Sequence, residues 1–168
     1  MTYLTQLHLI DQIIEDTGIS KHASDKLTPA ASTIILGADK EGKEFDYNFD
    51  YRSVVGKLNF LEKSTRPDIA YAVHQCARFA SNPRKSHGDA IIHLAKYLRN
   101  TQEKGLILSP SAKHGLEVYA DADFSGSWIK HEAQDDPDTA KSRSGYAIKY
   151  AECLLTWKSK LQTTNQAH

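Results

Sequence analysis

The stretch that decides the fold, residues 51–82, reads YRSVVGKLNFLEKSTRPDIAYAVHQCARFASN. Its first half predicts an amphipathic helix, because one apolar stripe repeats at helical spacing: Val54, Val55, Leu58 and Leu61. Asp50 stands just ahead, and its carboxylate can accept a hydrogen bond from a free N–H of the first turn. Gly56 lies inside this helix at a cost of about 1 kcal/mol relative to alanine. Glycine would be tolerated there if another element packed closely against it.

A second helix follows directly. We expect this helix to begin at Arg66-Pro67-Asp68, because proline fits a first helical turn and an aspartate there lies at the positive end of the helix dipole. Asn82-Pro83 ends this helix. Its apolar face is predicted from the residues Ile69, Val73, Cys76 and Ala80.

A third helix is predicted on the carboxyl side. Ser86 with Asp89 three residues later resembles a capping box. Residues 48–100 thus hold three consecutive helices with short connections, which implies antiparallel neighbours. The buried face of the third consists of Ile91, Leu94, Ala95 and Leu98.

The amino-terminal side is less regular. Leu7, Ile10 and Ile14 share one helical face, so residues 5–17 predict a short amphipathic helix that Gly18 ends. Residues 18–46 are polar and form a linker or long loop. Only Ile34-Ile35-Leu36 could supply a short strand or an anchoring contact there.

The apolar period changes from helical to alternating after residue 105. Residues 106–108 form a short apolar run, residues 116–121 and 146–150 alternate apolar and polar positions, and residues 153–157 add a further apolar run. Residues 124–143 form a polar connection of a length that is usually functional or mobile. We therefore predict an α+β fold, with about four helices followed by an incomplete antiparallel sheet of three to four strands. No helix follows to cover the second face of this sheet, which predicts poor solubility or self-association.

Charge is unevenly distributed, although the 168 residues carry 21 basic and 21 acidic side chains. Residues 52–104 hold ten Lys/Arg and four Asp/Glu, whereas residues 1–51 hold four and nine. The middle third is the only candidate for a phosphate-binding surface. A solvated helix face that is simply rich in Lys and Arg is the alternative.

Other classes of protein are disfavoured. No apolar run approaches the ~20 residues of a membrane helix, and the first eleven residues do not resemble a signal peptide. Cys76 and Cys153 belong to no paired motif, which indicates reduced, buried thiols in an intracellular protein, cytoplasmic or nuclear and not secreted. The eight histidines show no zinc-ligand spacing.

A family resemblance emerges when these segments are taken together. Residues 51–73, with Thr65-Arg66-Pro67-Asp68-Ile69-Ala70-Tyr71 at their centre, resemble the stretch that follows the palm in copia-type reverse transcriptases. Residues 82–101 continue that likeness, and residues 4–13 look like the start of the thumb. Tyr119-Ala120-Asp121-Ala122-Asp123 is similar to the first strand of the family's RNase H. Its second and third strands resemble residues 141–146 and 156–160.

The resemblance implies an organisation of the chain and a chemistry. It divides the chain into a thumb-like helix and linker (1–46), a three-helix reverse transcriptase connection block (47–104), a truncated RNase H-like β-meander (105–164) and a divergent tail (165–168). RNase H chemistry uses two Mg²⁺ ions held by several carboxylates. The resemblance makes Asp121 the first catalytic and metal ligand, with Asp123 nearby. The polymerase aspartate pair and the RNase H glutamate have no counterpart, so we expect a Pol polyprotein fragment that is inactive alone.

The basic helices predict contacts to the backbone of a template–primer duplex or RNA–DNA hybrid, with the remainder of the Pol polyprotein as a further partner. The candidate residues are Arg66, Arg78, Arg84, Lys85, Lys96 and Arg99. Arg66 has a structural alternative, a charge pair with Asp68 or with another carboxylate.

Two other functions stay open. The chain could be a domesticated nucleic-acid-binding or protein-interaction module without catalysis. It could also be a complete small hydrolase that uses Asp121, Asp123 and the loop acids of residues 135–138. Those loop acids are more typical of a solvated loop.

Overall fold

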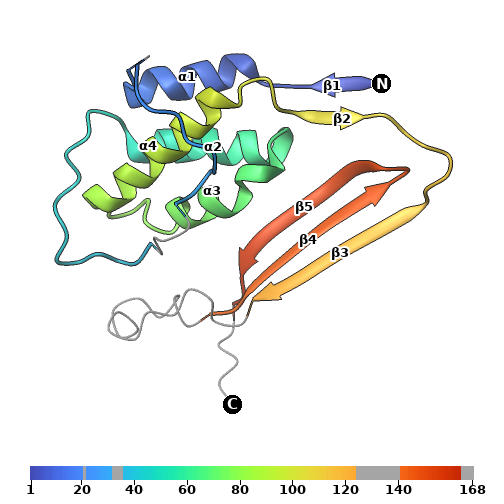
Figure 1. Ribbon diagram of the computed structural model, residues 1–168. Helices are drawn as coiled ribbons and strands as arrows, with labels where there is room; N and C mark the ends of the chain where they lie inside the picture. The colour runs from blue at the N-terminus through green and yellow to red at the C-terminus, as the bar shows by residue number, and fades with distance from the viewer. Residues whose placement is uncertain (21, 32–35, 124–140, 164–168) are drawn as a thin grey trace. The chain divides into compact units, whose positions relative to one another are not determined.

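The structure is a computed structural model that describes residues 1–20, 22–31, 36–123 and 141–163 (Figure 1). The predicted α+β class, with helices first and an antiparallel sheet after them, is confirmed. Two compact units divide the chain, one formed by Thr5–Gly105 and the other by Met1–Leu4 with the residues from Leu106 onward. The elements in chain order are β1 (Thr2–Leu4), α1 (Leu7–Thr17), α2 (Tyr51–Ser64), the 3-10 turn η1 (Pro67–Ile69), α3 (Ala70–Ala77), α4 (Lys85–Asn100), β2 (Leu106–Leu108), β3 (Leu116–Asp123), β4 (Arg143–Tyr150) and β5 (Cys153–Leu161).

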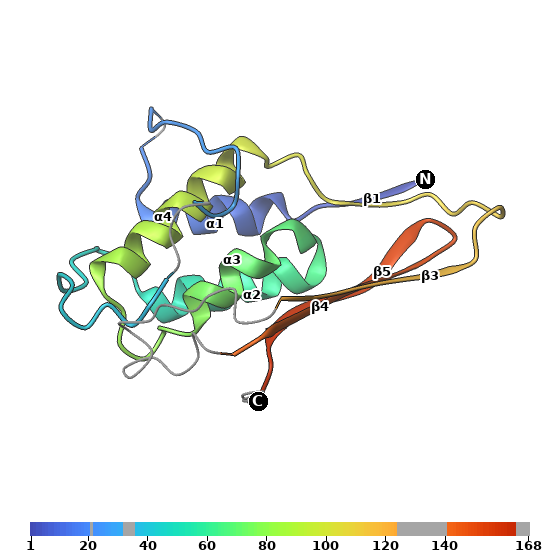
Figure 2. The same cartoon turned by 60° about the horizontal axis from the view of Figure 1, so that its bottom comes forward.

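The first unit is a packed group of four helices. Helix α1 contacts α2 and α4, and α3 likewise contacts α2 and α4 (Figure 2). Helices α2 and α4 turn their predicted apolar stripes inward, whereas in α1 the predicted Leu7 is exposed and Ile13 is buried instead, and Ala80 lies beyond the end of α3. Burial of apolar side chains is the main favourable contribution to folding. The fully buried centre includes Ile10, Ile13, Val54, Leu58, Leu61, Ile69, Ile91, Leu94 and Leu98.

The helix ends agree with the sequence in two places. The carboxylate of Asp50 accepts the backbone N–H of Ser53 at 3.1 Å, so the predicted cap of α2 is confirmed. Gly18 ends α1 in the left-handed conformation with φ 63°, where glycine carries no steric penalty. Its N–H donates to the carbonyl of Glu15.

The predicted capping box of α4 is wrong. The helix begins one residue earlier than Ser86, and the Nδ1 atom of His87 accepts the backbone N–H of Arg84 at 2.8 Å. Ser86 instead hydrogen-bonds Asp39, and Asp89 accepts the hydroxyl of Tyr47. The linker residues Asp39 and Tyr47 hydrogen-bond the side chains of Ser86 and Asp89, respectively. A local sequence pattern does not reveal such distant partners.

The two helical glycines have opposite environments. Gly56 is exposed, and a Cβ built on it would meet no atom within 4 Å, so close packing does not account for this glycine. Gly88 in α4 is the closely packed one. A Cβ there would lie 2.3 Å from Cδ2 of Tyr47. The missing side chain of Gly88 thus makes room for the linker.

The described part of the linker is irregular but packed. Leu36 is buried, which confirms an anchoring contact there, whereas Ile34 and Ile35 lie outside the described residues. Four alternating aromatic residues end the linker: Phe45, Tyr47, Phe49 and Tyr51. The ring of Phe45 lies 5.3 to 5.6 Å from the other three, within the range of favourable aromatic pairs.

The second unit holds two antiparallel sheets. Strands β1 and β2 pair from Thr2↔Leu108 to Leu4↔Leu106, and β1 was not predicted because three residues give no readable alternation. Strands β3, β4 and β5 form a meander in sequence order, as expected (Figure 1). A two-residue turn joins β4 to β5, with positive φ at Ala151 and Glu152.

Two further expectations can be checked in this structure. Cys76 and Cys153 are buried and free, as predicted. Burial raises the pKa of the Cys76 thiol to about 12, so it stays protonated at neutral pH. Within the described ranges, every helix is too short or too polar to cross a bilayer.

Candidate nucleic-acid interface and carboxylate pair

Arg66 is the centre of a buried network rather than a surface contact. Its side chain is 1% exposed. Nε and Nη2 donate to the two carboxylate oxygens of Asp68 at 2.9 and 2.8 Å, and Nη1 donates to the carbonyl of Thr101 at 3.0 Å. Nη2 also donates to the hydroxyl of Thr101, and Tyr97 donates to Asp68 at 2.7 Å. The charge pair with Asp68 is confirmed, and Arg66 has no N–H left at the surface for a phosphate.

The network also determines the charge of Asp68. Burial by itself raises the pKa of this carboxyl, but hydrogen bonds from Arg66 and Tyr97 outweigh it and hold the pKa below its usual value. Asp68 therefore stays ionised at neutral pH. A bidentate pair between ionised groups fixes orientation as well as adding energy, so η1 is tied to the end of α4.

Arg99 also has a structural role. Its Nη1 donates to the carbonyl of Ser20 at 2.6 Å, and its Nη2 donates to Asp25 at the same distance and to the carbonyl of Ala23. These contacts hold the start of the linker on α4. The arginine side chain is 16% exposed, so little of it can reach a ligand.

Arg78 and Arg84 are half-buried. Arg78 donates to the carbonyl of Leu36 at 3.3 Å and to Gln75 at 3.0 Å, and its guanidinium lies over the ring of Phe79. Arg84 stands at the start of α4, and its Nε is buried without a hydrogen-bond partner. Neither arginine resembles a freely extended phosphate contact.

Lys85 and Lys96 are the two lysines of the predicted set, and both are half-buried. They are eleven residues apart, about three helical turns, and so lie on one side of α4. Lys85 pairs with Asp46 at 3.2 Å, which raises the pKa of the lysine, but both side chains are partly exposed and such pairs exchange readily. Lys96 forms no ion pair in the described part of the chain. His93 lies between them.

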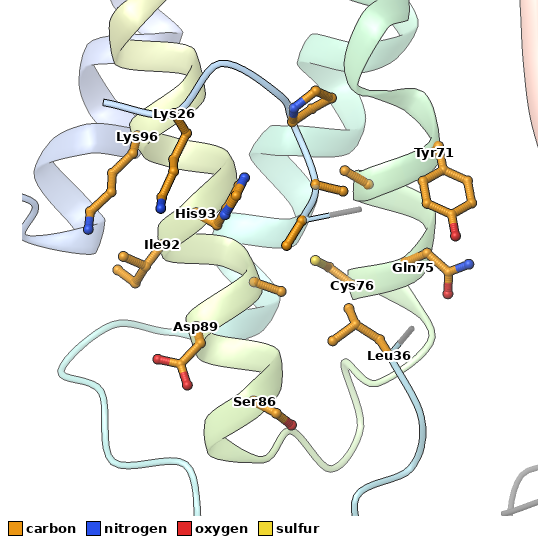
Figure 3. Close-up of a pocket in the computed structure, with 15 residues that line it drawn as sticks. Lys26, Leu36, Tyr71, Gln75, Cys76, Ser86, Asp89, Ile92, His93 and Lys96 are labelled. Atoms are coloured by element: carbon orange, nitrogen blue, oxygen red, sulfur yellow. The ribbon is translucent and has the colours of Figure 1, made fainter. Parts of the chain in front are cut away.

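A cavity of about 350 Å³ opens beside His93 and Lys96, between α3, α4 and the linker (Figure 3). Its apolar lining includes Leu36, Ala72, Cys76 and Ala90. Lys26 from the linker lies with His93 and Lys96 at one end of the cavity (Figure 3). We call Lys26, Lys85, His93 and Lys96 the α4 basic face. The sequence did not single out Lys26 or His93, because only the fold brings the linker beside α4.

His87 links the beginning of α4 to the linker. Its ring is buried and lies parallel to the ring of Phe79, with centroids 4.1 Å apart. Nδ1 accepts a backbone N–H, so the ring proton is on Nε2, which donates to the carbonyl of Gly37 at 2.8 Å. Burial lowers the pKa of His87. The hydrogen bond to Gly37 and the charge of Asp39 raise the pKa by less, and the charges of Arg78 and Arg84 lower it further.

This arrangement predicts a pH dependence of stability. A folded-state pKa below the unfolded value near 6.5 means that the His87 contribution is complete above that pH and is lost as the pH falls through the folded pKa. We expect the urea midpoint to fall between pH 7 and 5, with up to about 1.4 kcal/mol lost per pH unit. His87→Gln should reduce this slope, whereas His22→Gln, at an exposed position, should leave it unchanged. Equal slopes in all three proteins would contradict the assignment.

Asp121 and Asp123 lie on β3, and both are exposed. They share one face of the sheet, as the sequence predicted from their spacing. Gly145 stands opposite Asp121 and Arg143 opposite Asp123 in the β3–β4 register. In the ranges that the structure describes, no three His, Cys, Asp or Glu side chains converge on a metal position. The acids of residues 135–138 lie outside those ranges.

A two-ion Mg²⁺ site therefore does not fit the residues described. Mg²⁺ prefers octahedral oxygen coordination, and a pair of ions needs several shared carboxylates. Two exposed carboxylates with a guanidinium opposite one of them supply too few ligands. The described structure is an α+β protein with a basic helical face and a separate carboxylate pair.

The sequence of the chain is similar to those of transposon polyproteins. The chain is 33% identical over 165 residues, 95% of its length, to the retrovirus-related Pol polyprotein from transposon TNT 1-94 of Nicotiana tabacum. It is 34% identical over 113 residues, 67% of its length, to the Pol polyprotein from transposon RE1 of Arabidopsis thaliana. The chain spans 12% and 7% of those two polyproteins, respectively. No family model and no solved structure matches it.

A shorter relative covers a similar extent of sequence. The chain is 36% identical over 117 residues to the secreted RxLR effector protein 161 of Plasmopara viticola, a match that covers 70% of this chain and 76% of that protein. The chain therefore belongs to a family that unites transposon Pol polyproteins with this Plasmopara protein.

Proposed function

We propose that this chain binds the sugar–phosphate backbone of an RNA–DNA hybrid through the α4 basic face and does not cleave the nucleic acid. The observation that carries the proposal is the alignment of Lys85, His93 and Lys96 along one side of α4, with Lys26 beside them. Lys85 and Lys96 are about 16 Å apart along the helix axis. Point charges at that spacing can contact separate phosphates without reading the bases.

We also propose a finer assignment within the family. The chain corresponds to the end of a copia-type reverse transcriptase joined to the start of its RNase H. The TRPDIAY motif at residues 65–71 and the YADAD motif at residues 119–123 support this assignment. The match to a tobacco transposon polyprotein over 95% of the chain is consistent with it.

Binding is tested by fluorescence anisotropy with a labelled RNA–DNA hybrid of mixed sequence at several salt concentrations. Lys85→Gln with Lys96→Gln should weaken binding at low salt and reduce the salt slope by about two, because each phosphate contact contributes about 0.9. The matched control is Lys63→Gln with Lys113→Gln, which removes the same charge at exposed positions outside the face. Equal losses in both pairs, or no binding by the parent protein, would contradict the proposal.

Catalysis is tested on the same hybrid. We expect no cleavage with Mg²⁺, because Asp121 and Asp123 alone supply too few oxygen ligands for two ions. Asp121→Asn should leave hybrid binding unchanged. Mg²⁺-dependent cleavage that Asp121→Asn abolishes would instead establish a hydrolase.

A protein-interaction module is the second candidate function. It is favoured by the Plasmopara relative, which is named an effector and matches over 76% of its own length. The two candidates differ in the binding assay. An interaction module would show no hybrid affinity at low salt, and neutralising the α4 basic face would have no effect on it.

A further inference from the structure

One face of the β3–β4–β5 sheet is apolar, aromatic and exposed. The register places Val118 opposite Ile148 and Leu116 opposite Tyr150, so these side chains share a face. Tyr146 lies on the same face because it is two residues from Ile148. The exposed fractions are large, at 68% for Leu116, 62% for Val118, 57% for Tyr150 and 40% for Tyr146.

The same face is also basic. Lys158 stands opposite Tyr146, and Lys160 stands opposite Ser144, and both lysines are exposed. The acidic residues of the three strands, Glu117, Asp121 and Asp123, alternate onto the other face. The sheet thus has one face on which these three acids lie with Arg143 and Lys149, and one face that combines tyrosines with lysines. We call the latter the tyrosine face and define it by Leu116, Val118, Tyr146, Ile148, Tyr150, Lys158 and Lys160.

This composition fits an unpaired nucleic-acid strand better than a duplex. Exposed rings on a sheet can stack on bases, while neighbouring lysines attract the phosphates between them. A duplex keeps its bases stacked on one another and offers the rings no face to contact.

The spacing of the tyrosines suits an extended strand. Tyr146 and Tyr150 are four residues apart on β4, about 13 Å at the usual rise per residue. They can therefore contact separate bases, with the apolar Ile148 between them. We propose that the tyrosine face is a binding platform for single-stranded nucleic acid, distinct from the α4 basic face.

The test uses the whole chain and a labelled oligothymidine of about twelve nucleotides, a length that single-strand-binding folds cover. Tyr146→Leu with Tyr150→Leu keeps an apolar surface but removes both rings, and we expect at least about a tenfold loss of affinity. Tyr146→Phe with Tyr150→Phe keeps the rings and should bind nearly as the parent does. This pair of variants separates loss of stacking from loss of folding.

The control is Tyr119→Leu, which removes an exposed ring from the opposite face of the same sheet. It should bind oligothymidine as the parent does. Lys85→Gln with Lys96→Gln should also retain this binding, so that failure of the hybrid proposal leaves this one intact. Absence of oligothymidine binding at low salt, or an equal loss with Tyr119→Leu, would overturn the assignment. A concentration-dependent dimer in sedimentation that only the leucine pair abolishes would assign the face to a second copy instead.

Discussion

Replacing Arg66 by alanine is expected to lower the free energy of unfolding by about 2–4 kcal/mol, because a fully buried side chain and its hydrogen bonds to Asp68 and Thr101 are lost. Arg66 is among the largest fully buried side chains of the described structure. The substitution would leave the Asp68 carboxylate and the Thr101 carbonyl without their guanidinium donors, and it would open a cavity between η1 and α4. Urea denaturation at neutral pH measures the effect.

The control for this prediction is Arg52→Ala. Arg52 also donates to a backbone carbonyl, that of Ala80 at 2.9 Å, but its side chain is exposed. Its loss should change stability by less than about 1 kcal/mol. Arg66→Lys should fall between the two, since an ammonium cannot reproduce the bidentate pair. If Arg66→Ala were as mild as Arg52→Ala, the buried network would contribute nothing to the fold.

Gly88→Ala is expected to destabilise the protein by about 1–3 kcal/mol through overpacking. The new Cβ would lie 2.3 and 2.4 Å from two ring carbons of Tyr47 and 3.0 Å from a carbon of Phe45. The ring of Tyr47 is held by its bond to Asp89 and by Lys85, whose Nζ lies 4.5 Å from the ring centroid. Thermal or urea unfolding would report the loss.

Gly56→Ala is the matched control, with the opposite expected sign. The position is exposed and open, so alanine should stabilise α2 by about 1 kcal/mol through helix propensity alone. In a Tyr47→Ala background, Gly88→Ala should destabilise much less, because only the 3.0 Å approach to Phe45 remains. A destabilising Gly56→Ala, or an undiminished loss at Gly88 without Tyr47, would contradict this account.

These structural roles change how the basic charge of the helices is interpreted. Residues 52–104 are strongly basic by sequence. The guanidinium groups of Arg66 and Arg99, however, donate their hydrogen bonds to partners within the protein, among them Asp68 and Asp25. Only a subset of the predicted phosphate contacts, chiefly Lys85 and Lys96, keeps its charge near the surface. A count of charges therefore overstates the binding surface, since arginine is also the usual residue for buried pairs.

The sequence by itself determined the fold class and most of the secondary structure; the exceptions are β1 and the end of α3, which comes at Ala77 and not at Asn82-Pro83. Apolar periodicity located α1 to α4 and the three strands of the meander, because the 3.6 and 2.0 residue periods are properties of the local backbone. The cap at Asp50 and the stop at Gly18 were equally local. The charge pair of Arg66 with Asp68 was predictable as an alternative, since the two residues are neighbours in η1.

Tertiary structure alone decided which of the basic side chains are engaged within the fold and which can contact a ligand. Arg66 reaches Thr101, 35 residues away, and Arg99 reaches Asp25, 74 residues away. The cap formed by His87, the close packing at Gly88 and the place of Lys26 beside Lys96 all depend on how the linker lies on α4. The charge of a residue follows from its identity, and the apolar period of a segment follows from the local sequence. The burial of a side chain depends in addition on distant segments that only folding brings near.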